Sequence, residues 1–382
     1  MDRNFTAVIT ASACAFNIGM LSWWAQPIIV HSLIEGMALS ESQAGLAIST
    51  EIMAVAIVSF IVSSQLHRLP IRKTCLIACI IAVCCHILSA FAGQYEYLLL
   101  ARLCAGIAEG FVYAIAIGIV ASTINPDRGY GVINAVNIVY CSIFMALVPS
   151  ISLSTPNVVM FVSLAIASVI LIPFVRKLPE YVSISTDNSG ENTHGFNRSA
   201  WSMLLAMFLW GTGINTLWPY LFYIGSSTDL EVAEVGLTLG SAGFAAFAGV
   251  ILMTTIGNRF GHLLPLLAGF SVNLVGVLLI TQVPTATTYI VGVMLLMLAV
   301  YFILPFLLAI SAEADPTGRV AAAMGGMYMF TGGIGPVIGG NLVAGIGARG
   351  IGIVSVGECL LTMLLVWKIV HLEKISCANN EQ

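Results

Sequence analysis

Charged residues are missing from two stretches of this chain that are each too long for a single membrane span. No Asp, Glu, Lys or Arg lies between Arg259 and Glu313, and none lies between Arg128 and Arg176. One transmembrane helix needs about 20 apolar residues. Each stretch must therefore cross a membrane twice, and polar residues near 282–288 mark the turn in the first.

The remaining sequence continues this pattern and predicts an all-α membrane protein with twelve transmembrane helices. Only 8% of the residues are charged, compared with about 25% in soluble domains. The one long polar connection predicts a cytoplasmic linker at 177–199, between six-helix bundles at 1–176 and 200–382. The expected spans are 6–30, 43–66, 73–94, 98–122, 130–152, 157–176, 200–224, 233–256, 262–281, 286–311, 320–346 and 349–371.

Several classes of partner are not expected. The net charge of −4 gives no sign of nucleic-acid binding, and the nine cysteines form no CxxC pair or Cys/His cluster with ligand spacing. We expect no metal, no cofactor and a monomer. A phosphate-binding loop of the form GxxxxGK[ST] is also missing from the sequence, so an ion gradient should supply the energy.

The basic residues predict the orientation. With the N-terminus inside, every Lys and Arg except Arg102 and Arg349 falls on the cytoplasmic side, whereas the outer loops are acidic. Basic residues favour cytoplasmic loops. We therefore expect an integral protein of the bacterial cytoplasmic (inner) membrane with both termini in the cytoplasm.

The two halves of the chain are internal repeats. A gap-free shift of 191 residues, half of the 382-residue length, places Gly45 on Gly236 and Arg68 on Arg259. The same shift pairs the arginines that follow the fourth and tenth spans. Two such halves can pivot about a site near the membrane midplane and expose it to each side in turn.

The fourth span contains two charges, Arg102 and Glu109. A charge at the bilayer centre costs about 2.5–3.5 kcal/mol, which makes such residues candidates for function. Seven residues are close to two helical turns, so the side chains share one face about 10 Å apart along the axis. Each needs a partner elsewhere. Glu51 in the second span is a second buried acid, which serves as a proton site, as a counter-charge to Arg102 or as a residue reached by outside water.

The fourth span also carries a family resemblance. Arg102 and Gly106 match the pattern R-x-x-x-G of the major facilitator superfamily, and Glu109 follows. This arrangement resembles the fourth span of the anion:cation symporters and of Spinster-like carriers. The resemblance implies that Glu109 carries the coupled proton and that Arg102 modulates it. The anion symporters often have a further basic residue in the first span, and this chain has none there.

The loop between spans two and three is similar to the superfamily motif G-x-x-x-D-R-x-G-R-R/K in part. Arg68, Arg72 and Lys73 match, whereas the glycines and the aspartate are replaced. The second copy keeps Arg259 and Gly261. The resemblance implies a gating role for these basic residues, which can bind helix C-termini and carbonyls.

Span eleven contains Gly335, Pro336, Gly339 and Gly340 as a GPxxGG sequence. Antiporters of the superfamily carry a similar signature in span five, so we interpret this copy as a closely packed gating helix and not as a sign of antiport. Glycines permit close helix approach and proline bends a helix.

Polar and aromatic residues in the spans predict the substrate site. By analogy with the superfamily, spans one, four, seven and ten line the cavity. For Trp24 and Trp218 a place at the membrane interface is an equal alternative. The candidate substrate-binding residues are Asn17, Trp24, Tyr113, Asn137, Tyr140, Trp210, Asn215, Trp218, Tyr301 and Tyr328.

These features predict a proton-coupled secondary transporter of a small organic solute, either an organic anion or an amphipathic or aromatic compound, and not an enzyme. The alternatives within the class are a proton-independent facilitator and a multidrug exporter. A polytopic membrane enzyme acting on lipids is the alternative from another class. Such an enzyme would usually show a His/Asp or Cys/His group at the membrane surface, and the surface histidines His67, His262 and His371 have no acidic neighbours in the sequence.

Overall fold

A computed structural model describes residues 3–151, 155–181, 198–257, 259–314 and 319–380, and within these ranges all regular structure is helical. Twelve helices in this part are long and apolar enough to cross a membrane, as the sequence predicts. The α-helices are α1 (Arg3–Met37), α2 (Glu41–Gln65), α3 (Ile71–Ala90), α4 (Tyr95–Ala121), α5 (Pro126–Leu147), α6 (Pro156–Val175), α7 (Arg198–Leu217), α8 (Leu221–Ser226), α9 (Val232–Ile256), α10 (Leu263–Thr281), α11 (Ala286–Ala314), α12 (Arg319–Ile346) and α13 (Ala348–Asn380).

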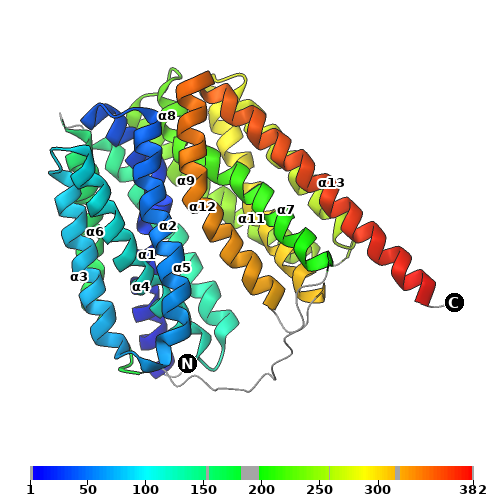
Figure 1. Ribbon diagram of the computed structural model, residues 1–382, viewed down its shortest axis with the longest axis horizontal. Helices are drawn as coiled ribbons and strands as arrows, with labels where there is room; N and C mark the ends of the chain where they lie inside the picture. The colour runs from blue at the N-terminus through cyan, green and yellow to red at the C-terminus, as the bar shows by residue number, and fades with distance from the viewer. Residues whose placement is uncertain (1–2, 152–154, 182–197, 258, 315–318, 381–382) are drawn as a thin grey trace. The chain divides into compact units, whose positions relative to one another are not determined.

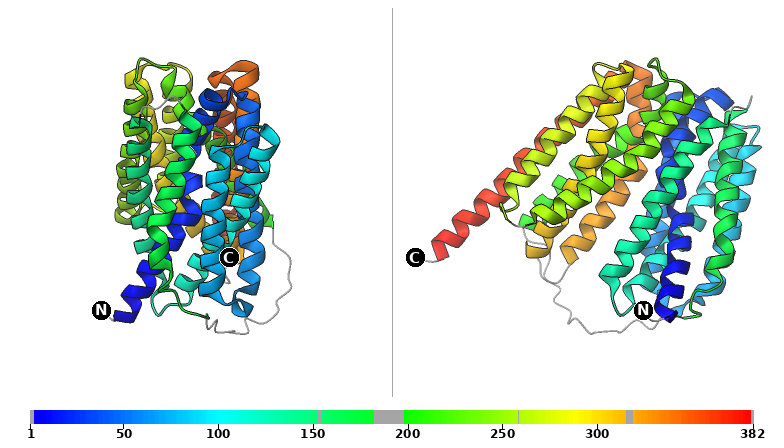
Figure 2. Two further views of the ribbon diagram at one scale, coloured as in Figure 1. Left: turned by 90° about the vertical axis from the view of Figure 1, so that its left-hand side faces the viewer. Right: turned by 180° about the vertical axis from the view of Figure 1, so that it is seen from behind.

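The chain forms two compact units, Met1–Glu191 and Asn192–Gln382. The first contains α1 to α6 and the second contains α7 to α13, as the colours from blue to red in Figures 1 and 2 show. A 3₁₀ turn at Trp218–Tyr220 joins α7 and α8 into one span. The first helix ends at Met37, beyond its expected end at residue 30, and its last turns contain polar residues such as His31 and Glu35.

Helix boundaries follow the same repeat as the sequence. Helices α2 and α9 begin and end 191 residues apart (232 − 41 and 256 − 65). Both start with a capping box at equivalent positions. Gln43 accepts from the Ser40 amide through Oε1 at 3.0 Å, and Glu234 accepts from the Glu231 amide through Oε2 at 2.9 Å. Capping boxes satisfy N–H groups that a helix start leaves unpaired.

Helix α4 lies in the middle of the first unit and packs against α1, α2 and α3. Glycines permit the close approach. A Cβ atom at Gly106 would collide with the Glu51 carbonyl oxygen of α2, and one at Gly110 would lie 2.9 Å from Val58 Cβ. On the other side, a Cβ at Gly19 of α1 would lie 3.1 Å from the Glu109 carbonyl oxygen. These glycines therefore allow both α1 and α2 to pack closely against α4 near Arg102 and Glu109.

In the second unit, α7 packs against α12 and α13. The GPxxGG sequence forms the contact with α7. A Cβ at Gly335 would lie 2.5 Å from the Asn215 carbonyl, and one at Gly339 would lie 2.5 Å from the Thr216 carbonyl oxygen. Tyr220 Oη donates to the Pro336 carbonyl at 3.0 Å. Gly340 is also buried.

Large apolar side chains cover much of the outside of each unit. Phe60 on α2 is 82% exposed and Phe244 on α9 is 75% exposed. Such a surface suits lipid, since the hydrocarbon core of a bilayer requires apolar contact.

Candidate functional site

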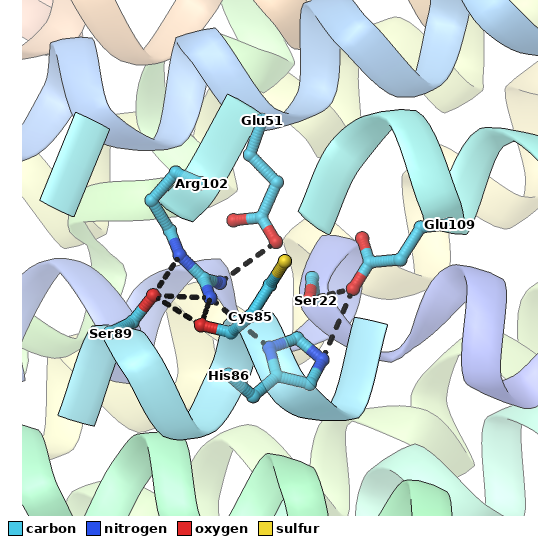
Figure 3. A network of polar contacts seen from close by, with 7 residues as sticks. All are labelled: Ser22, Glu51, Cys85, His86, Ser89, Arg102 and Glu109. Carbon is cyan, nitrogen blue, oxygen red and sulfur yellow. Dashed lines mark hydrogen bonds and ion pairs between the residues drawn. The ribbon is translucent and has the colours of Figure 1, made fainter. Parts of the chain in front are cut away.

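The three buried charged residues Glu51, Arg102 and Glu109 of the first unit meet in one network (Figure 3). Arg102 Nη1 on α4 donates to Glu51 Oε1 on α2 at 2.9 Å, and both side chains are fully buried. Of the interpretations of Glu51 given by the sequence, the structure therefore matches the counter-charge. We call the connected group the Arg102 network. Its members are Ser22, Glu51, Cys85, His86, Ser89, Arg102 and Glu109.

Helix α3 supplies the other partners of Arg102. Nε and Nη2 donate to Ser89 Oγ at 2.9 and 2.7 Å, and Nη2 donates to the Cys85 carbonyl at 3.2 Å. The guanidinium carbon lies 4.6 Å from the centre of the Phe161 ring on α6. Arg102 is thus held by a carboxylate, a hydroxyl, a carbonyl and an aromatic face. This arrangement satisfies most of the donors of a buried guanidinium.

Glu109 has a different set of partners. Ser22 Oγ on α1 donates to Glu109 Oε1 at 2.7 Å, and His86 Nε2 on α3 lies 3.3 Å from the same oxygen. The other oxygen, Oε2, is buried without a hydrogen-bond partner in the described part of the chain. The seven-residue spacing predicts that Arg102 and Glu109 do not pair with each other and that each needs a partner elsewhere. In the structure Arg102 pairs with Glu51 on α2, Glu109 accepts from Ser22 on α1, and His86 on α3 lies against both.

The contact with Arg102 favours one neutral tautomer of His86. Arg102 Nη2 lies 3.2 Å from His86 Nδ1. A guanidinium only donates, so this contact favours an Nδ1 that accepts and, in a neutral imidazole, a hydrogen on Nε2. Nε2 lies 3.3 Å from Glu109 Oε1. His86 links the charged pair on one side to the second carboxylate on the other.

His86, Ser89 and Ser22 are absent from the residues that the sequence analysis selects. A histidine inside an apolar span is a usable signal, because ionisable residues within membrane helices mark functional positions. Its direction could not be predicted, since that depends on how α3 packs against α4. The two serines carry no signal, because serines in helices commonly bond to their own backbone, as Ser89 Oγ does with the Cys85 carbonyl at 2.8 Å.

Three members of the network, Glu51, His86 and Glu109, bring potential metal-binding atoms within 4.8 Å of one another. The chemistry fits a metal poorly. Arg102 Nη2 lies 3.2 Å from His86 Nδ1, and the Arg102 guanidinium is a fixed cation beside Glu51. The same arrangement is well suited to holding and moving a proton.

The asparagine candidates for substrate binding take part in two similar pairs, one in each unit, and Thr331, which was not a candidate, completes the second pair. In the first, Asn137 Nδ2 on α5 donates to Asn17 Oδ1 on α1 at 3.1 Å. In the second, Asn215 Nδ2 on α7 donates to Thr331 Oγ1 on α12 at 3.1 Å. All four side chains are buried. Each pair joins the first membrane-spanning helix of its unit to the fifth one, α1 to α5 and α7 to α12.

The aromatic candidates are also within the two units. Trp210 stacks on Tyr328 with ring centres 6.0 Å apart, and its Nε1 has no hydrogen-bond partner in the described part of the chain. Tyr113 packs on Phe16 at 5.7 Å. Tyr140 Oη donates to the carbonyl of Ala167 on α6 at 2.8 Å. The remaining members are Trp24 and Trp218, which are buried, and Tyr301, which is half-buried.

The basic residues that match the superfamily loop motif are exposed, with Arg68 just after α2 and Arg72 and Lys73 in the first turn of α3. Arg72 Nε donates to the Leu178 carbonyl after α6 at 2.6 Å, and Arg68 Nε donates to His67 Nε2 at 3.1 Å. Lys73 and Arg259 are exposed as well. Arg72 therefore binds the carbonyl end of a neighbouring helix, which is where a cation is favoured.

Twelve apolar helices with a charge network buried among them are the architecture of a secondary transporter. The family model of the Major Facilitator Superfamily matches residues 11–332, and the chain belongs to that superfamily. It is a transporter embedded in a membrane, and the interpretation as a lipid enzyme is wrong. A comparison with curated proteins gives no match.

Solved structures with the same fold cover nearly the whole chain. The nucleoside transporter NupG, as a D323A mutant, has a TM-score of 0.73 at 14% identity, covering 97% of this chain and 99% of its own. A bacterial homologue of the human lysosomal transporter Spinster has a TM-score of 0.68 at 15% identity, covering 97% and 96%. The xylose transporter XylE from E. coli has a TM-score of 0.72 at 16% identity, covering 96% of each chain. At such identities the likeness establishes the fold.

Proposed function

We propose that this chain is a proton-coupled secondary transporter of a small organic solute and that Glu109 carries the coupled proton. One observation carries the proposal. Glu51 forms an ion pair with Arg102 Nη1 at 2.9 Å, whereas Glu109 Oε1 accepts from the hydroxyl of Ser22 and lies 3.3 Å from His86 Nε2. Within the described residues, Glu109 is therefore the acid of the network that has no ion pair with Arg102.

Counting charges supports one exchangeable proton. With both carboxylates ionised and His86 neutral, the network holds two negative charges and one positive charge. A single proton makes it neutral. Burying an unpaired ion costs several kcal/mol even after the surroundings relax. Gain or loss of this proton therefore changes the stability of the packed arrangement by an amount large enough to shift a conformational equilibrium.

The geometry leaves room for that proton. Among the described residues, Oε2 of Glu109 has no hydrogen-bond partner, as is also true of Glu51 Oε2, whereas Oε1 of Glu109 accepts from Ser22. A proton on Oε2 would preserve the contacts of Oε1. Glu109 lies on α4 where α1 crosses closely at Gly19, so its charge acts directly on the packing of these two helices.

The proposal includes the domain organisation and membrane orientation that the sequence predicts. In this proposal a monomer, whose bundles at 1–176 and 200–382 are joined by the linker at 177–199, exposes the bound solute to each side of the membrane in turn, in a bacterial inner membrane with both termini in the cytoplasm. The solute is bound by amide and aromatic side chains, among them Asn17, Asn215 and Trp210. Proteins of the same fold include transporters of nucleosides and of D-xylose. A solute with polar groups and a ring fits this combination.

The test begins with a thermal-shift screen of organic acids, sugars, nucleosides and dyes, because a ligand that binds the folded state raises its apparent stability. The ligand found is then added to proteoliposomes that contain the purified protein and an internal pH-sensitive dye. Proton coupling predicts a change of internal pH that depends on the ligand and disappears with an uncoupler. Counterflow of labelled ligand with no pH change would instead favour the proton-independent facilitator.

A further inference from the structure

The position of His86 between Arg102 and Glu109 has a chemical consequence. Each nitrogen of the ring faces one of the two residues, with Nδ1 at 3.2 Å from Arg102 Nη2 and Nε2 at 3.3 Å from Glu109 Oε1 (Figure 3). An imidazole in such a place can accept a proton on one nitrogen and release one from the other. Arg102 blocks the accepting nitrogen.

We propose that His86 is a proton relay to Glu109 and that Arg102 is its gate. This inference rests on the proposed role of Glu109 as the proton carrier. When Arg102 releases Nδ1, a hydronium ion or water molecule that reaches the ring gives up a proton, which forms an N–H bond at Nδ1. The N–H bond at Nε2 breaks, and its proton forms an O–H bond on Glu109. The ring ends as the opposite neutral tautomer, so charge and protons balance.

The gate can open without removing Arg102 from the network. Nη2 carries two hydrogens but has three acceptors within reach, namely Ser89 Oγ at 2.7 Å, the Cys85 carbonyl at 3.2 Å and His86 Nδ1 at 3.2 Å. Since the hydrogens are fewer than the acceptors, the bond to His86 can be lost while the other two remain. The charge pair with Glu51 uses Nη1 and is unaffected.

Few charged groups of the described residues lie near the ring. The charged or titratable groups that face His86 are Glu51 on α2 and Arg102 and Glu109 on α4, and α1 adds the hydroxyl of Ser22. Helix α6, which also packs against α3, contains no titratable residue between Pro156 and Val175. His86 itself is 1% exposed.

The first test is the tautomer of His86, measured by nitrogen NMR on purified protein labelled with ¹⁵N-histidine. The chain has six histidines, and the signal lost in His86→Gln assigns the residue. We expect a hydrogen on Nε2 and none on Nδ1 across about pH 5 to 8, where histidine normally changes charge. In Arg102→Gln the ring should become doubly protonated at the acidic end. A hydrogen on Nδ1 in the wild type, or identical titration in both proteins, overturns the proposal.

The second test measures the rate of proton uptake separately from the amount of proton taken up, using a rapid pH jump and an indicator dye with purified protein. Glutamine keeps a donor and an acceptor at position 86 but cannot relay a proton. His86→Gln should take up the same amount of proton as the wild type at a rate at least about tenfold lower, as for loss of a proton-transfer group. An unchanged rate overturns the relay. Full proton uptake by a Glu109→Gln variant contradicts the proposed function instead. In that case the NMR measurement alone tests whether Arg102 controls protonation of His86.

Discussion

Arg102 donates to Glu51 across 2.9 Å and forms no ion pair with Glu109, although Arg102 and Glu109 belong to the same helix. One acid is held in a charge pair, and the proposed function assigns the exchangeable proton to the other. The two roles depend on helix packing, because the partners of Arg102 come from α2 and α3.

The first prediction concerns the Arg102–Glu51 pair. Arg102→Gln should destabilise the purified protein by about 3–5 kcal/mol, because it leaves a buried carboxylate unpaired. The double variant Arg102→Gln/Glu51→Gln should be more stable than Arg102→Gln alone. The measurement is unfolding in detergent, followed by circular dichroism. As a control, Glu96→Gln at the exposed start of α4 should add no rescue. Equal stability of single and double variants would show that the pair is not coupled.

The second prediction concerns the close approach of α2 and α4. Gly106→Val should weaken the first unit by about 1–3 kcal/mol, the usual cost of overpacking, since its side chain would meet the Glu51 carbonyl. Gly131 of α5 is the matched control, because a Cβ there meets nothing within 4 Å. Gly131→Val should leave the melting temperature nearly unchanged. A similar loss in both variants would count against the specific contact.

Much of the fold could be predicted from sequence for physical reasons. Membrane spans are recognised by length and lack of charge, and the repeat of 191 residues correctly places equivalent helix starts such as Glu41 and Val232. Arg102 and Glu109 could be selected because charges are rare at that depth. The choice among the interpretations of Glu51 required the packing of α2 on α4.

Other features depend on side-chain direction and could not be predicted. His86 lies in a span with Cys and Ala neighbours, and sequence spacing gives no indication that both of its nitrogens meet charged residues of α4. Tyr140 was selected for substrate binding, yet its hydroxyl bonds to the Ala167 carbonyl. The predictions for Asn17, Tyr113, Asn215 and Tyr301 as residues of one central cavity stay predictions.

The third prediction concerns Trp210, which stacks on Tyr328 and has an unpaired N–H. If it binds the ring of an aromatic solute, Trp210→Phe should weaken binding about three- to tenfold, since aromatic pairs contribute about 0.5–1.5 kcal/mol beyond their area. The measurement is the ligand-induced thermal shift over a concentration series. Trp201 on the same helix is 61% exposed and provides the control. Equal effects of Trp210→Phe and Trp201→Phe would remove Trp210 from the binding site.

The central claim is that Glu109 carries the coupled proton, and Glu109→Gln tests it most directly. Glutamine keeps the size of the side chain and a hydrogen-bond acceptor for Ser22, but it cannot release a proton. The measurement is uptake of labelled solute into proteoliposomes with and without an imposed pH gradient, beside Glu96→Gln as the control. We predict that Glu109→Gln loses gradient-driven accumulation and keeps counterflow, which needs no net proton movement. Accumulation at the wild-type level in Glu109→Gln would contradict the account.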